Sequence, residues 1–282
     1  MNRPGPAELN LAAVQQSFDR AAAAYDRHAV LQHEVEQRLL ERLEYLRTEP
    51  ARMLDAGCGT GIASHALQQQ YPGASVIGLD WSTGMLNQLR ARNGGQVAPL
   101  ALCADMQELP LAARSMDLVF SSLAIQWCPH PGKLFADFRR VLKPGGMLLF
   151  STFGPDTLHE LKTAWAKADD RPHVNEFADM HDIGDLVVAS GFVEPVFDVD
   201  VITLEYKDVI SLMRDLKAIG AHNAASGRSP GLRGRVRACR TRPLPLPRAA
   251  GCSARVQHLR FQAQPLGGER DRRLRESAGQ EC

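Results

Sequence analysis

The feature that most constrains the fold is a short apolar run that ends in an acid and continues into three alternate glycines. It occupies residues 52–61 and reads RMLDAGCGTG, and a helical pattern follows over residues 62–68. Glycines at this spacing lack the Cβ atoms that would keep a backbone turn away from a flat ligand, and they permit positive φ angles. Because a helix begins at the turn, its free amides carry partial positive charge toward ligand oxygens. The pattern predicts a nucleotide-type turn, with a plain strand-to-helix turn as the alternative.

The rest of the body alternates between strand and helix patterns. Four more buried-type runs follow this first one, over residues 74–80, 98–104, 115–128 and 147–153. The end of the run over 115–128 passes into a loop. Helical patterns separate these runs, and the last of them stops at a Lys-Pro-Gly-Gly sequence. Further helical patterns cover residues 11–24, 30–46, 181–190 and 208–219, and residues 196–206 resemble a sixth strand. Five strands separated by helices predict an α/β fold with a doubly wound, mostly parallel sheet.

Three successive strands of this sheet end in acids, at Asp55, Asp80 and Asp105. Ligands of open parallel sheets bind outside the carboxyl ends of the strands, so we expect the three acids to converge on one crevice. Asp80 lies 23 residues beyond Gly57. At this spacing an acid can accept both ribose hydroxyl protons, with helix capping as its alternative role. Asp105 and the following Met106 are placed to bond an exocyclic amine and to pack on a purine face.

The glycine spacing also indicates which ligand the crevice takes. A dinucleotide site normally shows G-x-G-x-x-G, but residue 62 is Ile62 and the third glycine comes at Gly61. Carboxylates suit a ligand with a ribose, an adenine and a cationic amino-acid end better than a pyrophosphate. S-adenosylmethionine meets that description.

Composition limits the class of protein and its compartment. The length of 282 residues, 44% of them hydrophobic, allows one large domain or two small ones. Six cysteines lie far apart without a C-x-x-C pair, so we expect neither a metal site nor a disulfide framework. Neither a signal-peptide core nor an apolar run of about eighteen residues is present, and we therefore expect a cytoplasmic protein without membrane contact.

Two segments are candidates for covering the crevice. Residues 18–29 place Tyr25, an acid and a histidine between two predicted helices. This stretch is either a surface hinge or a lid that closes over the ligand. Gln126 and Trp127 leave the fourth strand where the transferred group and its acceptor would meet, although packing beneath the lid is an equal alternative for the indole.

These motifs together resemble the class I S-adenosylmethionine-dependent methyltransferases, which have a Rossmann-like fold. Within that class, four stretches resemble the malonyl-[acyl-carrier protein] O-methyltransferases of biotin biosynthesis, namely residues 18–32, 122–128, 170–173 and 216–221. The resemblance covers residues 10–230. It implies methylation of the free carboxylate of a malonyl thioester, which masks its charge for fatty-acid synthesis; methylation of another small-metabolite acid is the alternative.

The residues and the resemblance together predict the site. The predicted cofactor-binding residues are Asp55, Gly57, Gly59, Gly61, Asp80, Trp81, Met85, Asp105, Met106 and Ser122. Tyr25, Gln126 and Trp127 are predicted to shape the acceptor pocket, and His28 is a further candidate for which a structural role is favoured. No catalytic base is predicted, because a carboxylate is already ionised at pH 7 and can attack a sulfonium methyl directly.

The acceptor implied by the resemblance is bound to an acidic carrier protein. The net charge of +1 divides into +9 from residue 228 onward and −8 on residues 1–227. An acidic body requires a local basic patch to bind an acidic carrier. Arg139, Arg140 and Lys143 are the predicted docking residues, with a solvated helix end as the alternative, and no nucleic-acid partner is expected.

The C-terminal part has a different composition from the body. From Arg228 it holds thirteen arginines and no lysine, and no acid occurs before Glu269. Such a basic, proline-rich stretch is typical of a disordered extension, of a nucleic-acid or membrane patch, or of sequence read out of frame, and we favour the last of these. The predicted organisation is therefore a helical lid over residues 1–47, a methyltransferase domain over 48–227 and a basic tail over 228–282.

The resembled fold has a seventh strand, and we expect it to be missing or aberrant here. Prolines at 243, 245 and 247 cannot donate to a central strand, and 254–263 would place arginines in a sheet covered on both faces. We expect this tail to be mobile and quickly cut by trypsin. The alternative to an active enzyme is therefore a non-catalytic remnant, in which damage to the C-terminus abolishes turnover.

Overall fold

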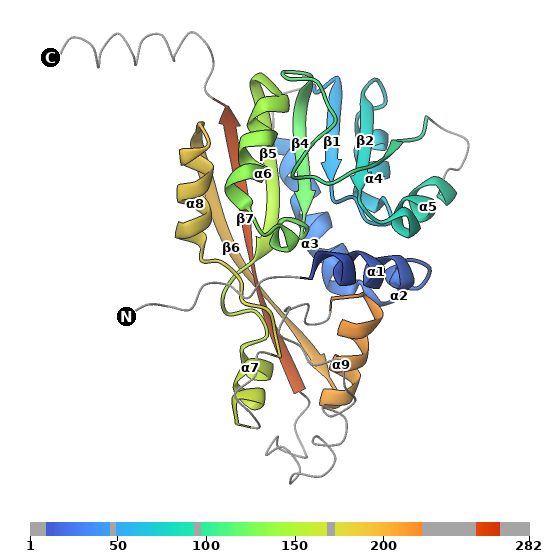
Figure 1. Cartoon of the computed structure of the whole chain (residues 1–282), viewed down its shortest axis with the longest axis vertical. Helices are drawn as coiled ribbons and strands as arrows, with labels where there is room; N and C mark the ends of the chain where they lie inside the picture. Colours follow the sequence, from blue (N-terminus) through green and yellow to red (C-terminus); the bar gives the residue numbers. More distant parts are fainter. Residues whose placement is uncertain (1–9, 46–48, 93–96, 168–172, 222–251, 266–282) are drawn as a thin grey trace, which may run out of the picture.

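The computed structural model describes residues 10–45, 49–92, 97–167, 173–221 and 252–265. They form a seven-stranded sheet in the order β3-β2-β1-β4-β5-β7-β6 (Figure 1). Neighbours from β3 to β5 run parallel, and β7 runs antiparallel to both β5 and β6. The strands are β1 (Arg52–Ala56), β2 (Ser75–Asp80), β3 (Leu100–Cys103), β4 (Met116–Ser122), β5 (Leu142–Phe153), β6 (Phe192–Tyr206) and β7 (Cys252–Pro265).

Helices cover both faces of the sheet (Figure 1). They are α1 (Leu11–Ala21), α2 (Tyr25–His28), α3 (Val30–Glu41), α4 (Ile62–Gln70), α5 (Thr83–Ala91), α6 (Pro131–Val141), α7 (His159–Ala166), α8 (Met180–Ala189) and α9 (Val209–Ala218), with 3-10 turns η1 (Arg42–Tyr45) and η2 (Ile125–Trp127). No helix in these described ranges is both long and apolar enough to cross a bilayer.

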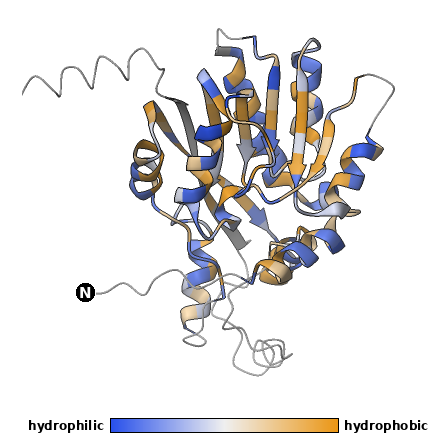
Figure 2. Cartoon of the chain, turned by 45° about the horizontal axis from the view of Figure 1, so that its top comes forward, coloured by the Kyte–Doolittle hydropathy of each residue, from blue (hydrophilic) through white to orange (hydrophobic). Residues whose placement is uncertain are grey.

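Alternate side chains of the central strands supply two separate cores. Met53 of β1 packs in a cluster with Leu39 and Leu67 of α3 and α4, whereas its neighbour Leu54 packs in a cluster with Phe138 of α6. This follows from the two-residue period of a strand, which points successive side chains to opposite faces. The middle strands are consequently apolar on both faces, as Figure 2 shows.

The predicted α/β class with five alternating strands is confirmed, and several boundaries differ, among them the following two. The helix predicted over 11–24 ends at Ala21, and α2 forms a separate short helix after it. β5 begins at Leu142, directly after α6, because Leu142 already pairs with Met116 of β4 before the glycines that were predicted to stop the helix.

The prediction that the seventh strand is missing is wrong. β7 lies between β5 and β6 and pairs with both, for example Ala263 with Leu148 and Gln257 with Val201. The remaining parts of the predicted tail, 228–251 and 266–282, lie outside the described residues. Their predicted disorder and trypsin sensitivity therefore stay predictions.

The error came from assuming that helices cover both faces of the whole strand. β5 pairs with β7 only over residues 258–263, whereas β6 continues along β7 as far as Cys252 (Figure 1). β6 alternates between exposed and partly buried positions along this ribbon, with Val201 55% exposed. Arg255 pairs with Thr203 in the part of the ribbon that extends past β5, so the assumption does not hold there, whereas Arg260 pairs with Ser151 of β5 and Asp198 of β6 within the sheet. Val256 of β7 is 3% exposed and packs with Leu31 and Val35 of α3.

Candidate cofactor and acceptor site

A cavity lies at the carboxyl ends of the parallel strands, where the sequence predicted a crevice. It encloses about 1050 Å³, counting the space at its open mouth. Its walls come from the N-terminal helices, the glycine turn, and the segments that follow β2, β3 and β4. Ile219 at the end of α9 and Phe153 at the end of β5 complete the wall.

The three glycines have different roles in the turn. All have positive φ, at 76°, 53° and 83° for Gly57, Gly59 and Gly61. A Cβ at Gly57 would lie 2.3 Å from the Cβ of Ala124, and one at Gly61 would lie 2.5 Å from a side-chain carbon of Leu89. Gly59 has nothing within 4 Å on that side, so its backbone stays open. Gly57 and Gly59 line the cavity, whereas Gly61 forms the N-cap of α4.

Asp80 holds the glycine turn to the start of α5. Its Oδ2 accepts from the Gly59 amide at 2.9 Å and its Oδ1 accepts from the Ser82 amide at 2.8 Å. The helix cap itself is Ser82, whose hydroxyl accepts from the Met85 amide. Asp80 is 8% exposed and lines the cavity, and burial raises its pKa to about 6. Each carboxylate oxygen has a second lone pair with which to accept a ligand hydroxyl.

Asp55 does not reach the cavity, which corrects its predicted role as a cofactor contact. It is 1% exposed and accepts from the Ser64 hydroxyl of α4 at 2.6 Å. Since it lies one residue before the end of β1, it points between the sheet and α4 rather than out of the strand end. Burial raises its pKa to about 7. Gly61 likewise supports the turn from outside the cavity.

The end of β3 forms a second polar wall. Asp105, Met106 and Gln107 line the cavity, and Oδ1 of Asp105 accepts from the Gln107 amide at 2.8 Å. The Gln107 side chain donates to the same carboxylate at 3.4 Å. Met106 lies beside the glycine turn, since a Cβ at Gly57 would lie 2.9 Å from its terminal methyl. An acid and an apolar side chain therefore do meet here, as predicted; Gln107 was not predicted.

Aromatic side chains and one amide form the mouth. Phe18 of α1 packs edge-on against Trp127 at 5.4 Å between ring centroids and lies 6.5 Å from Tyr25. Gln126 is fixed by its donation to the Leu123 carbonyl at 2.5 Å. Tyr25, Gln126 and Trp127 all line the cavity. Burial and nearby carboxylates raise the pKa of Tyr25, so its hydroxyl stays protonated.

Other predicted residues also fall where the sequence placed them. Trp81, Met85 and Ser122 line the cavity. His28 lies outside it and pairs with Asp215 of α9 at 3.3 Å, which fits the structural role predicted for it.

The N-terminal wall contains residues that the sequence reading missed. Gln32, His33 and Glu36 of α3 line the cavity. Glu36 accepts from the Ala63 amide at 2.8 Å, and burial raises its pKa to about 8. The available signal was the apolar stripe of this helix, because Gln32 and Glu36 sit four residues apart beside it.

The cavity fits a cationic cofactor with a ribose. Its described lining contains three acids, Glu36, Asp80 and Asp105, and neither lysine nor arginine. Such a wall favours a positive charge and would repel a pyrophosphate. The open backbone at Gly59 and the free lone pairs of Asp80 are arranged for close approach and for hydroxyl donors.

The predicted docking residues lie at the opposite edge of the sheet. Arg139 and Arg140 end α6 and Lys143 begins β5, at the amino ends of the strands. Lys143 Nζ contacts Asp117 at 2.6 Å, and all three bases make intramolecular contacts. A crossover helix runs antiparallel to the strands it connects, so its C-terminal end lies far from the ligand-binding edge. This position argues against the predicted docking role.

Comparisons with known proteins identify the family. A protein-family profile described as a methyltransferase domain matches residues 54–150. A malonyl-[acyl-carrier protein] O-methyltransferase of Gallionella capsiferriformans is 52% identical over 230 residues, which cover 79% of each chain. The chain belongs to this family. A relative of the same name from Methylovorus is 52% identical over 233 residues, covering 80% of this chain and 79% of its own.

Solved structures show the same fold. A putative methyltransferase of Bacillus halodurans has a TM-score of 0.56 at 17% identity, covering 80% of this chain and 97% of its own. Phosphoethanolamine N-methyltransferase 2 of Haemonchus contortus, in complex with S-adenosyl-L-methionine, has a TM-score of 0.53 at 21% identity, covering 88% and 57%. The family member described here is an S-adenosylmethionine-dependent methyltransferase, and the predicted cofactor is confirmed.

Proposed function

We propose that this methyltransferase esterifies the free carboxylate of a malonyl thioester carried by an acyl carrier protein, a step of biotin biosynthesis. Relatives named for this reaction match 79% of the chain at 52% identity. The observation that carries the proposal is the composition of the described cavity lining, which combines the acids Glu36, Asp80 and Asp105 with aromatic side chains and contains neither lysine nor arginine. The acids suit a cationic cofactor, and the aromatic side chains suit an acceptor that brings its own negative charge.

The bound cofactor supplies an electrophilic methyl group on a cationic sulfur. Asp80 would accept the ribose hydroxyls, and Asp105 with Met106 would hold the adenine. Phe18, Trp127 and Phe153 exclude water at the mouth. Attack by an already ionised carboxylate requires no proton transfer. The chain would contribute alignment, by holding the carboxylate oxygen roughly 3 Å from the methyl carbon.

The donors near the mouth are neutral, which favours a carboxylate nucleophile. Tyr25, whose hydroxyl stays protonated because its pKa is raised, and Trp127, whose indole carries an N–H, both line the cavity. A carboxylate paired with a guanidinium would lose nucleophilicity, and the described lining holds no such partner. Neutral donors fix the acceptor while leaving its charge available for attack.

The carrier must approach from the cavity side of the molecule. Ile219 at the end of α9 lines the cavity, and the same helix exposes Arg214 and Lys217. Charge reversal at both positions should raise KM for a malonyl carrier about tenfold or more and leave KM for a carrier-free malonyl thioester unchanged. Reversal of Arg139 and Arg140 is the matched control at the far edge. An effect confined to that control pair would return the docking site to the predicted patch.

A panel of acceptors tests the proposed reaction. The purified chain should methylate malonyl carrier, methylate free malonate poorly, and leave acetyl carrier unmodified because it lacks the free carboxylate. Equal rates with unrelated small acids would favour the alternative of a small-metabolite methyltransferase. Methylation of acetyl carrier would contradict the carboxylate acceptor.

A further inference from the structure

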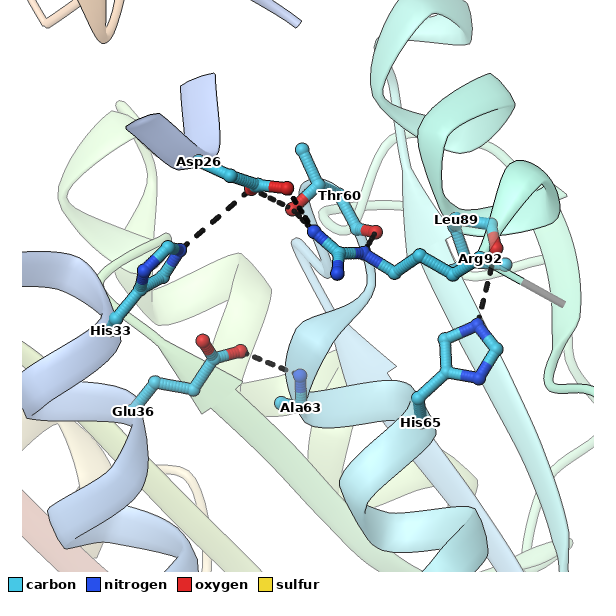
Figure 3. Close-up of polar contacts among 8 residues, drawn as sticks. All are labelled: Asp26, His33, Glu36, Thr60, Ala63, His65, Leu89 and Arg92. Carbon is cyan, nitrogen blue, oxygen red and sulfur yellow. Dashed lines mark hydrogen bonds and ion pairs between the residues drawn. The ribbon is translucent and has the colours of Figure 1, made fainter. Parts of the chain in front are cut away.

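A polar network joins the N-terminal helices to the glycine turn at the border of the cavity, where His33 and Thr60 belong to the lining and Asp26 and Arg92 do not (Figure 3). Asp26 of α2 accepts from the Thr60 hydroxyl at 2.6 Å, and its other oxygen contacts the guanidinium of Arg92. Arg92 also donates through Nε to the Thr60 carbonyl at 2.9 Å. His33 approaches the Asp26 carboxylate at 3.7 Å. Three segments distant in sequence therefore meet at one carboxylate and one guanidinium.

The network connects two parts of the cavity wall that are distant in sequence. Asp26 directly follows Tyr25, and the helix after it carries Glu36, both of which line the cavity. Thr60 belongs to the glycine turn that forms the other wall. Arg92 does not line the cavity and forms the C-cap of α5. It is placed to hold the two walls together without contacting a ligand.

We propose that Asp26 and Arg92 are positioning residues for the cofactor. They fix the N-terminal segment against the glycine turn, so that the side chains of both walls are preorganised when the cofactor binds. The Thr60 carbonyl is part of a turn with positive φ at the glycines on either side. A guanidinium that bonds this carbonyl and Asp26 together restricts the turn and the helix to one relative position.

Two other ion pairs of the same chain provide the comparison for this proposal. Arg42 contacts Asp198, and Arg38 contacts Asp200, joining α3 and η1 to β6. The Arg42 pair is 43% and 37% exposed, close to the 33% and 37% of the Arg92 and Asp26 pair. None of these four residues lines the cavity. An ion pair with only a general structural role should behave like the Arg42 pair.

Calorimetric titration of the full chain with S-adenosylmethionine tests the proposal. Arg92→Gln and Asp26→Asn should each raise the cofactor Kd about tenfold. The Kd of the double variant should be no higher than the higher of the two single-variant values, because both changes break the same contact. Arg92→Lys keeps the charge but cannot bond the Thr60 carbonyl and Asp26 at the same time. Its cofactor Kd should therefore lie between those of the wild type and Arg92→Gln. Arg42→Gln should leave Kd within about twofold while changing Tm by a similar amount to Arg92→Gln.

Two results would overturn the positioning role. One is a wild-type Kd in Arg92→Gln, and the other is equal weakening in Arg42→Gln. If Arg92→Gln does not fold, the isosteric Asp26→Asn decides alone by the same criterion. The titration contains no acceptor, so its outcome is independent of whether a malonyl thioester is the substrate.

Discussion

Replacing Asp80 with asparagine removes one negative charge from the cavity while preserving the shape of the side chain. The carboxylate accepts from the amides of Gly59 and Ser82 with its two oxygens. An asparagine can accept from only one of them, because its NH₂ group then faces the other N–H. The substitution thus perturbs the glycine turn and the proposed ribose contact together.

The expected loss follows from the hydrogen bonds involved. A hydrogen bond to a charged group contributes about 1.5–3 kcal/mol, and a neutral one contributes about half as much. Asp80→Asn weakens the acceptance of both ribose hydroxyl protons, and we expect a loss of about 2–3 kcal/mol in cofactor binding. This corresponds to a Kd that is about 30- to 150-fold higher.

Isothermal titration at pH 7.5 with S-adenosylmethionine measures this loss, and circular dichroism checks that the variant is folded. Asp55→Asn is the matched control, since Asp55 is buried on the same sheet edge but does not line the cavity. Its cofactor Kd should change by less than about threefold. A wild-type Kd in Asp80→Asn, or an equal loss in Asp55→Asn, would refute the ribose assignment.

Three further outcomes are expected. Val256→Ala should lower the free energy of unfolding by about 2–3 kcal/mol in urea titrations, against less than about 0.5 kcal/mol for exposed Val201→Ala; equal effects would mean that β7 does not pack as described. Phe18→Ala should lower kcat more than cofactor affinity, because it opens the mouth to water; a loss of affinity alone would contradict this. Three buried carboxyls have raised pKa values, namely Glu36, Asp55 and Asp80. Between pH 5 and 8 the folded unliganded chain therefore holds protons that the unfolded chain releases, and its free energy of unfolding should fall as pH rises; a rise over that window would contradict the burial of these acids.

Local patterns were sufficient to predict which residues at the strand ends reach the cavity, and the contacts of these residues with the cofactor stay predictions. The glycine turn and the acids at strand ends are set by neighbouring residues, so Gly57, Asp80 and Asp105 were placed correctly at the cavity from the sequence. Asp55 was not, because its orientation depends on where α4 packs relative to β1. Asp80 is the last residue of β2, whereas Asp55 lies one residue before the end of β1. A shift of one residue along a strand reverses the face to which a side chain points.

Features that depend on distant segments could not be predicted in this way. β7 pairs with two strands, β5 and β6, that lie more than forty residues earlier in the chain, and no local pattern in its own sequence indicates these partners. Glu36 reaches the cavity only because α3 lies against the start of α4. Arg139 was assigned to docking from charge alone, although the direction of α6 carries it to the far edge.

The most direct test of the account is a single-turnover reaction of the full chain with labelled S-adenosylmethionine and malonyl carrier protein. We expect about one labelled methyl group on the malonyl carboxylate for each enzyme-bound cofactor, because the described sheet is complete and the cavity requires no catalytic base. The label should be released as methanol by mild alkali, as expected of a methyl ester. A chain that binds the cofactor with normal affinity but transfers no label would contradict this account and favour a non-catalytic remnant.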